Sequence, residues 1–244
     1  MNRTILITGG STGLGADMAV DLAKGNRIVI HYCSSADAAK GVSEQVQAAG
    51  GTPYLVQADL TNENGAATIA NFVQDNLDSK LDVLINNAGA LIRRQTVEEL
   101  SWDLMQECFT LNVFSLMRLT SLCVPFLRKG TDPQIINLTS IAMRHGAPTA
   151  TIYGASKGAV DSFTRGCAKE LAPDIRVNAI APGVIETPFH EKVSTPEQLV
   201  KFAGMSALQR NGKAAHITSV VRLLIENDFI TGETIDVNGG LLMR

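Results

Sequence analysis

Short runs of β-branched and apolar residues alternate along the chain with segments of helical spacing, and this alternation constrains the fold most. The runs predict seven strands, at 3–8, 27–32, 53–58, 82–87, 134–139, 175–181 and 233–237. The segments predict helices at 14–24, 36–49, 64–77, 100–128, 153–171 and 214–226. Strand–helix alternation builds βαβ units. Because most runs are apolar on both faces, we expect an α/β fold whose parallel sheet is covered by helices on both sides.

One long insertion interrupts this pattern. Residues 182–212 have mixed polarity and lie between the sixth predicted strand and the last helix, which favours a lid or substrate loop at about 183–212. A length of 244 residues leaves one or two domains open. Because no linker, repeat or low-complexity tract is present, we expect a single domain over 1–244.

Charge and hydropathy narrow the choice of partners. The net charge is −3 and no Lys/Arg run exists, which argues against nucleic acid or an anionic membrane as a partner. We find no span of 18 apolar residues, and the apolar run before Gly9 is too short for a signal-peptide core. The four cysteines are scattered and read as free thiols, so we expect a cytoplasmic protein.

The stretch TGGSTGLG at 8–15 directly follows the first predicted strand and opens a helix. Glycines let the backbone approach a pyrophosphate, and a helix N-terminus offers free N–H groups. The spacing is not G-x-G-x-x-G, and a tight strand–helix turn would also use glycines. The same letters contain G-x-S-x-G, the nucleophile elbow of α/β-hydrolases, with Ser11 as nucleophile. Against the elbow, it would fall at the first strand, and no HGGG-type oxyanion stretch exists.

The stretch YGASK at 153–157 places Tyr153 and Lys157 one helical turn apart on one face. A nearby ammonium favours phenolate and would lower the tyrosine pKa from about 10 toward neutrality. Tyr153 would then serve as a general acid or base, and the small residues between the pair leave room for a bulky group. Taken alone, the pattern also suits a solvated helix face.

Other polar and small residues follow the predicted strands, where ligands of open parallel sheets bind. NNAG at 86–89 closes the fourth strand, Ser140 follows the fifth, and PG at 182–183 follows the sixth. Asn112 lies in the helix after the fourth strand. Together with the glycine loop and the Tyr–Lys pair, this ordered set resembles the short-chain dehydrogenase/reductase family over nearly the whole chain.

The resemblance implies a Rossmann-type doubly wound sheet and an NAD(P)-dependent oxidoreductase that moves a hydride between nicotinamide and a carbonyl or secondary alcohol. It implies that Tyr153 passes the proton, Lys157 lowers the tyrosine pKa and holds the nicotinamide ribose, Ser140 stabilises charge on the substrate oxygen, and Asn112 anchors a water in a proton relay. It places the dinucleotide against Gly9, Ser11, Thr12, Gly13, Leu14, Gly15, His31, Tyr32, Ser34, Ser35, Asp59, Leu60, Asn87, Ala88, Gly89, Tyr153, Lys157, Pro182, Gly183, Ile185 and Thr187.

The end of the second predicted strand bears on the choice of dinucleotide. An acidic residue there would bind the adenosine ribose and select NAD. No Asp or Glu occurs between Asp21 and Asp37, so nothing repels a 2′-phosphate. The arginine that many NADP-using relatives carry is also missing, although His31, Ser34 and Ser35 offer hydrogen bonds to a phosphate. We expect NADP to be preferred over NAD.

The insertion gives less information about the substrate. His190 and Glu191 begin like a zinc-binding H-E-x-x-H, but Ser194 stands at the fifth position, so we expect no catalytic metal. Two interpretations, a pocket rim or surface loops, are open for Arg93, Arg94, Met143, His145 and His190. A sugar, a polyol or a small keto compound would suit such a rim, and so would the substrate of 3-oxoacyl carrier-protein reductases, which the chain also resembles. A catalytically silent dinucleotide-sensing protein and a serine hydrolase are the alternatives from other classes.

The two longest predicted helices carry apolar residues on more than one face, whereas a helix covering one side of a sheet needs a single stripe. These residues are Leu104, Met105, Phe109, Phe114, Leu116 and Met117 on the first helix and Val160 and Phe163 on the second. Relatives of the family pair these helices between subunits. The C-terminal IDVNGGLLMR also ends in apolar residues, which indicates a second contact and a homotetramer.

Overall fold

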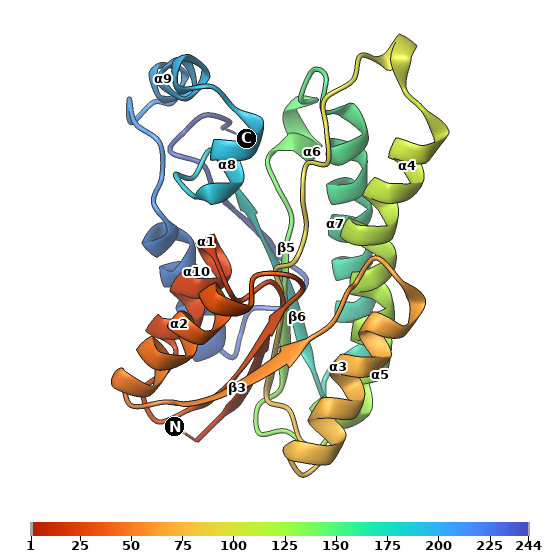
Figure 1. Cartoon of the computed structure of the whole chain (residues 1–244), viewed down its shortest axis with the longest axis vertical. Helices are drawn as coiled ribbons and strands as arrows, with labels where there is room; N and C mark the ends of the chain where they lie inside the picture. Colours follow the sequence, from red (N-terminus) through yellow and green to blue (C-terminus); the bar gives the residue numbers. More distant parts are fainter. Residues whose placement is uncertain (1, 244) are drawn as a thin grey trace.

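The computed structural model describes residues 2–243, and the side chains of residues 190–192 lie outside that description. All seven predicted strands are present: β1 (Thr4–Ile7), β2 (Arg27–Tyr32), β3 (Thr52–Gln57), β4 (Val83–Asn86), β5 (Gln134–Leu138), β6 (Arg176–Pro182) and β7 (Thr234–Val237). They form one sheet in the order β3-β2-β1-β4-β5-β6-β7, and each neighbouring pair is parallel (Figure 1). This arrangement confirms the predicted seven-stranded Rossmann-type sheet.

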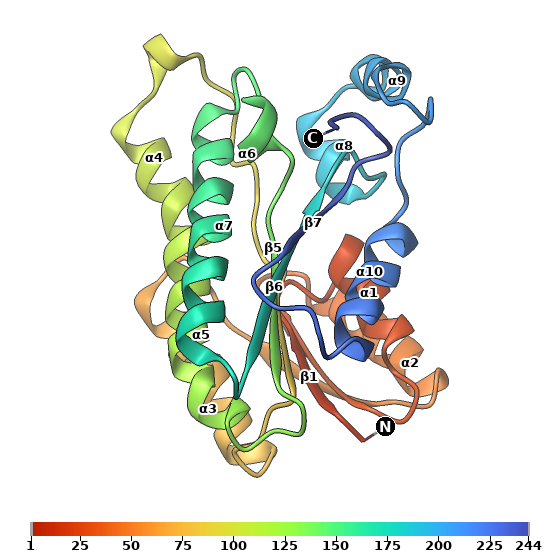
Figure 2. The same cartoon turned by 180° about the vertical axis from the view of Figure 1, so that it is seen from behind.

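Helices cover both faces of the sheet. One layer holds α1 (Gly13–Asp21), α2 (Ala36–Ala48) and α10 (Ala214–Glu226), and the other holds α3 (Glu63–Asn76), α5 (Ser115–Leu127) and α7 (Thr151–Leu171) (Figures 1 and 2). In β1, Ile5 and Ile7 pack into the first layer while Leu6 packs into the second. Successive side chains of a strand point to opposite faces. Two covered faces therefore require a continuous apolar run, which is why the strands were recognisable in the sequence.

The helical stretch from Trp102 to Leu127 is one element with a local irregularity. It consists of α4 (Trp102–Phe109), a π-helical turn (Thr110–Phe114) and α5. By length and composition alone it could cross a membrane, although it holds no unbroken run of 18 apolar residues. Its residues Leu119, Cys123 and Leu127 are buried in the core over the sheet, beside α3. The stretch is thus a core helix of the fold.

The predicted substrate loop is largely helical. Residues 182–212 contain α8 (Pro188–Val193) and α9 (Pro196–Met205). Thr195 begins α9 with a capping box to Gln198, which supplies acceptors for two otherwise unpaired N–H groups. No residue of α9 is buried. Within the insertion, α9 therefore lies on the surface, whereas Ile185 and Ser206 anchor its two ends in buried positions.

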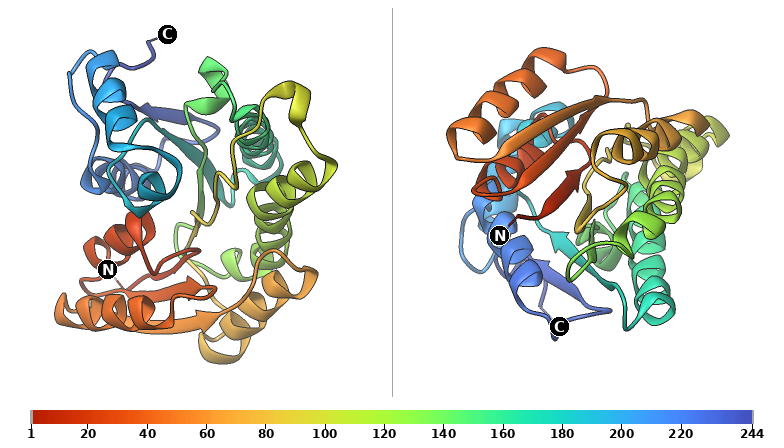
Figure 3. Two further views of the ribbon diagram at one scale, coloured as in Figure 1. Left: turned by 45° about the horizontal axis from the view of Figure 1, so that its top comes forward. Right: turned by 90° about the horizontal axis from the view of Figure 1, so that it is seen from below.

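Several connecting segments gather beyond one end of the sheet. A 3₁₀ turn (Val97–Glu99) follows β4, and α6 (Ala142–His145) follows β5. These segments, together with α8 and α9, lie beyond the carboxyl ends of the strands, at the top of Figure 1 and toward the viewer in the left view of Figure 3. This is the end of a parallel sheet where ligands bind.

Candidate active site

In the glycine loop (residues 8–15), the start of α1 packs closely on the backbone of the preceding turn. Gly9 and Gly13 have φ values of +62° and +55°, which glycine adopts without strain. A Cβ on Gly15 would overlap the carbonyl oxygen of Gly9 and lie 2.9 Å from Gly10 Cα. Thr12, the N-cap residue of α1, makes no side-chain capping bond. The first turn of α1 therefore presents N–H groups that could donate hydrogen bonds to an anionic phosphate.

His31 has a different role from the one that the sequence indicated. It is buried, its Nδ1 accepts a 3.1 Å hydrogen bond from Gly9 N–H, and its Nε2 lies 3.1 Å from Ala58 O. These contacts require the neutral ring with the proton on Nε2, and burial lowers the pKa of His31. Both ring nitrogens are engaged, so His31 ties the glycine loop to the end of β3 and has no nitrogen left for a phosphate or for Ser11.

The neighbouring residues at this edge are more open. Tyr32 is half-buried, and Ser34 and Ser35 are exposed after the end of β2. Asp59 follows β3, and its Oδ1 accepts hydrogen bonds from Thr61 N–H (2.9 Å) and Thr61 Oγ1 (2.7 Å). These bonds from Thr61 lower the pKa of the Asp59 carboxyl. Leu60 is buried beside it.

The Tyr–Lys pair lies near the start of α7. Lys157 is buried, and its Nζ donates a 2.8 Å hydrogen bond to Leu138 O at the end of β5. The same Nζ is 5.9 Å from the centre of the Tyr153 ring. Burial lowers the pKa of Lys157 to about 8.

The pKa of Tyr153 moves in the direction opposite to the expected one. Burial raises it to about 12, and a hydrogen bond with the Ser140 side chain opposes that rise. Lys157 is directed to a backbone carbonyl and to the ring, so its charge does not offset the loss of water around the phenol. Tyr153 and Ser140 are brought together as predicted, and the phenol is held in its protonated form.

Asn112 is fully buried in the π-helical turn. Its Oδ1 accepts from Ala90 N–H (2.9 Å), and its Nδ2 donates to Ala90 O (3.0 Å) and to Cys108 Sγ (3.3 Å). A Cβ on Gly89 would lie 2.7 Å from Asn112 Oδ1 and 3.1 Å from Lys157 Nζ. Glycine at this position lets the segment after β4 pass between the two side chains. Asn112 therefore clamps that segment beside the Tyr–Lys pair.

Cys108 is a residue that the sequence analysis missed. It is buried, it accepts the Asn112 hydrogen bond, and it interacts electrostatically with both Tyr153 and Lys157. Its position four residues before Asn112 puts both on one helix face, which was the available signal. A polar ladder was also missed: Asn86 Nδ2 donates to Asn137 Oδ1 (2.9 Å), and Asn137 Nδ2 donates to Thr164 Oγ1 (2.9 Å). This ladder joins β4 and β5 to α7.

The remaining residues predicted to contact the dinucleotide follow β4 and β6. Asn87 Nδ2 donates to Thr8 O (2.8 Å), which fixes Asn87 and the following Ala88 beside the glycine loop. Pro182 ends β6, and the tight approach of Gly183 to Asn238 leaves no space for a Cβ. Ile185 is buried, and the Thr187 side chain faces Gly13 across 3.6 Å, measured to an added Cβ. The start of the insertion thus contacts the glycine loop.

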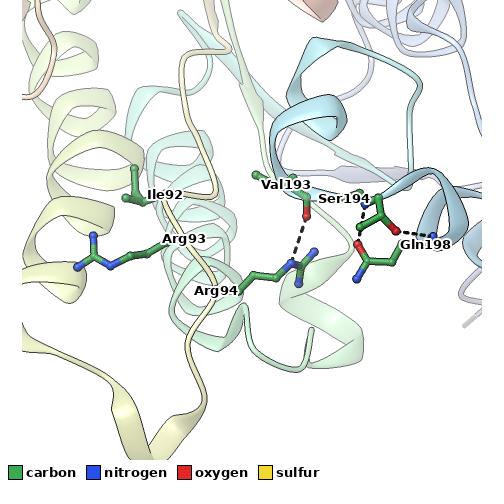
Figure 4. Close-up of a pocket in the computed structure, with 7 residues that line it drawn as sticks. Ile92, Arg93, Arg94, Val193, Ser194 and Gln198 are labelled. Atoms are coloured by element: carbon green, nitrogen blue, oxygen red, sulfur yellow. Dashed lines mark hydrogen bonds between the residues drawn. The ribbon is translucent and has the colours of Figure 1, made fainter.

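A cavity lies between the segment after β4 and the junction of α8 with α9. It has a volume of about 410 Å³ and is lined by Ile92, Arg93, Arg94, Val193, Ser194, Thr195 and Gln198 (Figure 4). Phe189 of α8 packs toward Tyr153, with ring centres 6.3 Å apart. Met143 is half-buried and His145 exposed on α6, whereas the side chain of His190 lies outside the described residues. Arg93 and Arg94 therefore lie at a cavity next to α8, the helix whose Phe189 faces Tyr153.

Comparison with known proteins gives a consistent result. The family model described as short chain dehydrogenase matches residues 3–198. The chain is 34% identical to a 3-oxoacyl-[acyl-carrier-protein] reductase of Synechocystis, covering 99% of this chain and 97% of the relative. It is 32% identical to a cyclopentanol dehydrogenase of Comamonas, covering 98% and 96%.

Solved structures agree. The angucycline C-6 ketoreductase LanV, determined with bound NADP, superposes with a TM-score of 0.90 at 27% identity, covering 98% of this chain and 95% of LanV. The protein is thus an oxidoreductase of the short-chain dehydrogenase/reductase family that acts on CH–OH and C=O groups.

Proposed function

We propose that the protein reduces the carbonyl group of a small molecule with hydride from NADPH, and catalyses the reverse reaction from the alcohol. The observation that carries this proposal is the Tyr153–Ser140 pair with buried Lys157 beside it, at the carboxyl end of β5. The bound nicotinamide would supply the hydride. The side chains of this chain would bind and orient the substrate and move the proton.

The proposed proton chemistry follows from the state of Tyr153. A phenol with a pKa of about 12 is protonated at neutral pH, so it can donate to an oxygen that gains negative charge. Ser140 would donate a second hydrogen bond to the same oxygen. Lys157 would hold the ribose hydroxyls, and Asn112 would keep the segment after β4 in place. This assignment favours Tyr153 as the acid in the reductive direction.

The residues present fit a dinucleotide. The uncapped N-terminus of α1 and the close contact at Gly15 suit a pyrophosphate. The residues proposed to hold the adenosine half are Tyr32, Ser34, Ser35, Asp59 and Leu60. We propose NADP as the preferred cofactor, because the end of β2 carries two exposed hydroxyls and no carboxylate. His31 is left out of the contacts to phosphate because both ring nitrogens are bonded within the protein.

The test is the absorbance at 340 nm with NADPH or NADH and a panel of ketones, keto acids and sugars. We expect NADPH oxidation that depends on the carbonyl compound. A 3-oxoacyl carrier-protein reductase is the second candidate, supported by the 34% identity to the Synechocystis enzyme, and a 3-oxoacyl thioester belongs in the panel. Binding of dinucleotide without turnover of any compound would favour a sensing protein. Ester hydrolysis without cofactor would favour a hydrolase.

We also propose a cytoplasmic homotetramer. Leu104, Leu116 and Val160 turn out to be buried within the chain, which removes part of the apolar surplus. The side chains of Trp102 and Phe114, however, are 69% and 56% exposed on the same helical stretch. Exposed apolar residues also occur elsewhere, at Phe229 and Met243. Two separate two-fold contacts would give four copies of 26.0 kDa, which light scattering behind a sizing column measures.

A further inference from the structure

Two consecutive arginines after β4 have different surroundings. Arg93 forms an ion pair with Glu107, with 3.0 Å between Nη1 and Oε2. Among the described residues, Arg94 contacts uncharged oxygens: its Nε donates to Val193 O (3.3 Å) and its Nη1 to Thr149 Oγ1 (3.4 Å). Figure 4 shows the two side chains on opposite sides of the segment. Within the described part of the chain, no carboxylate pairs with Arg94, so its charge is uncompensated there.

The cavity beside Arg94 has the size of a ligand pocket. Its volume of about 410 Å³ falls within the usual range for small-molecule sites. Among the described residues that line it, Arg94 turns its guanidinium toward Val193, Arg93 pairs with Glu107, and none is acidic. The side chains of Thr195 and Gln198 each accept a hydrogen bond from the other's backbone N–H in the capping box. They therefore shape the wall of the cavity and add no charge to it. The cavity therefore favours an anionic group over a neutral or cationic one.

The position of Arg94 relative to Tyr153 follows from its two partners. Thr149 lies four residues before Tyr153, and Val193 lies four residues after Phe189. Tyr153 and Phe189 face each other, with ring centres 6.3 Å apart. Val193 ends α8, about 6 Å along the helix from Phe189, and Thr149 lies in the turn two residues before α7 begins, so both partners of Arg94 are close in sequence to this aromatic pair. Gln95 N–H also donates to Thr149 O (2.9 Å), which ties the Arg94 segment to the entry of α7.

We propose that Arg94 binds the carboxylate of the substrate, and that the substrate is a keto acid whose carbonyl and carboxylate are separated by several bonds. This inference rests on the proposed function, because it takes the carbonyl to lie at Tyr153. The Arg94 guanidinium has N–H groups beyond the two bonds described above, and its planar fork suits a carboxylate in two-point contact. Arg93 is engaged with Glu107 and is a matched control on the same segment.

The experiment uses keto acids with a remote carboxylate and their methyl esters: 4-oxopentanoate, 5-oxohexanoate, 6-oxoheptanoate and 7-oxooctanoate. Each ester keeps the carbonyl and loses the charge. NADPH oxidation is followed for the full-length wild type, Arg94→Gln and Arg93→Gln. We expect at least one acid to exceed its ester in kcat/KM, mainly through KM. Arg94→Gln should lower kcat/KM for that acid by about ten- to hundredfold and for its ester by less than about twofold. Arg93→Gln should keep the preference for the acid.

Binding is measured separately by calorimetry, with 5-oxohexanoate added to the protein in the presence of NADP⁺, which cannot deliver hydride to a ketone. Weaker binding to Arg94→Gln than to Arg93→Gln supports the inference even if no compound is reduced, an outcome that would count against the proposed function alone. Esters reduced as well as acids, with an acid-to-ester ratio that Arg94→Gln leaves unchanged, would overturn the inference and leave the proposed function standing. So would a failure of all four acids, each measured in the same way, to bind to the wild type.

Discussion

The cofactor side and the substrate side of this site are built in different ways. On the cofactor side, the first turn of α1 packs on the backbone of Gly9 and Gly10, and buried His31 holds the loop through its hydrogen bond with Gly9 N–H. On the substrate side, α9 buries no residue, and the exposed Arg94 bonds across to Val193. Backbone contacts fix one position for a cofactor that many proteins share. An exposed frame allows its side chains to vary, which suits the recognition of one particular substrate.

The largest effect is expected where the two sides meet. Tyr153→Phe should reduce kcat by about 10²–10⁴-fold, because the phenolic proton is lost while the ring stays. Cofactor affinity, measured by fluorescence titration with NADPH, should stay within about twofold of the wild type. Lys157→Ala should weaken both turnover and affinity, because Lys157 is proposed to serve both. A Tyr153→Phe enzyme with more than half of the wild-type kcat would show that the proton comes from elsewhere.

Breaking the cofactor side should be almost as damaging. A methyl group on Gly15 would overlap Gly9 O, so Gly15→Ala should displace the loop and abolish measurable NADPH binding. Gly41→Ala is the control, since a Cβ at Gly41 in α2 meets nothing within 4 Å. It should raise the free energy of unfolding by up to about 1 kcal/mol, because alanine favours helix. Normal NADPH affinity in Gly15→Ala would contradict the tight packing described here.

A smaller change should redirect the choice of cofactor. Tyr32→Asp places a negative charge at the end of β2, near the proposed position of the 2′-phosphate. Two like charges about 4 Å apart repel by about 1 kcal/mol in water, so the kcat/KM ratio of NADPH to NADH should fall by about fivefold. Tyr32→Asn, which has a similar size and no charge, is the control. An equal fall in both variants would indicate that the tyrosine ring, rather than charge, sets the preference.

The smallest effect concerns pH and the support under the glycine loop. Burial lowers the pKa of His31, so the unfolded chain binds this proton more readily than the folded one. The stability contributed by neutral His31 is therefore complete above about pH 6.5 and is lost as the pH falls through its folded-state pKa. His31→Asn keeps one acceptor and one donor but does not titrate.

Urea unfolding at pH 7.5 and pH 5 measures this difference. We expect the wild type to lose more free energy of unfolding than His31→Asn between the two values. The exposed His145→Asn should behave like the wild type. The same loss in wild type and His31→Asn would show that His31 does not titrate in this range.

The sequence predicted best the strands and helices that have a regular pattern of apolar residues. Strands such as β1 and β4 are buried at every position because two helix layers cover them. Because all strands run in parallel, Ser140 after β5 and Gly89 after β4 had to come to one edge. In the structure Tyr153 lies against Ser140, and the side chains of Lys157 and Asn112 both approach Gly89.

What the sequence did not predict depends on contacts between distant segments. The pairing of His31 with Gly9 and Ala58 needs the loop and two strand ends together, and no local pattern marks it. The raised pKa of Tyr153 depends on how much water is excluded, which spacing alone does not give. The helix α9 was not predicted, because none of its residues is buried and it shows no apolar stripe facing a core. The difference between Arg93 and Arg94 arises from Glu107, which lies on another element.

The clamp on Ala90 has a consequence for redesign. Asn112 grips both the N–H and the carbonyl of this residue, so the chain is fixed at one point before it runs out to Arg94, four residues later. The exposed side chains of Arg93 and Arg94 can change without removing either bond of this clamp. These two positions can therefore be exchanged to accept other substrates, whereas an exchange at Gly89 or Ala90 would disturb the clamp itself.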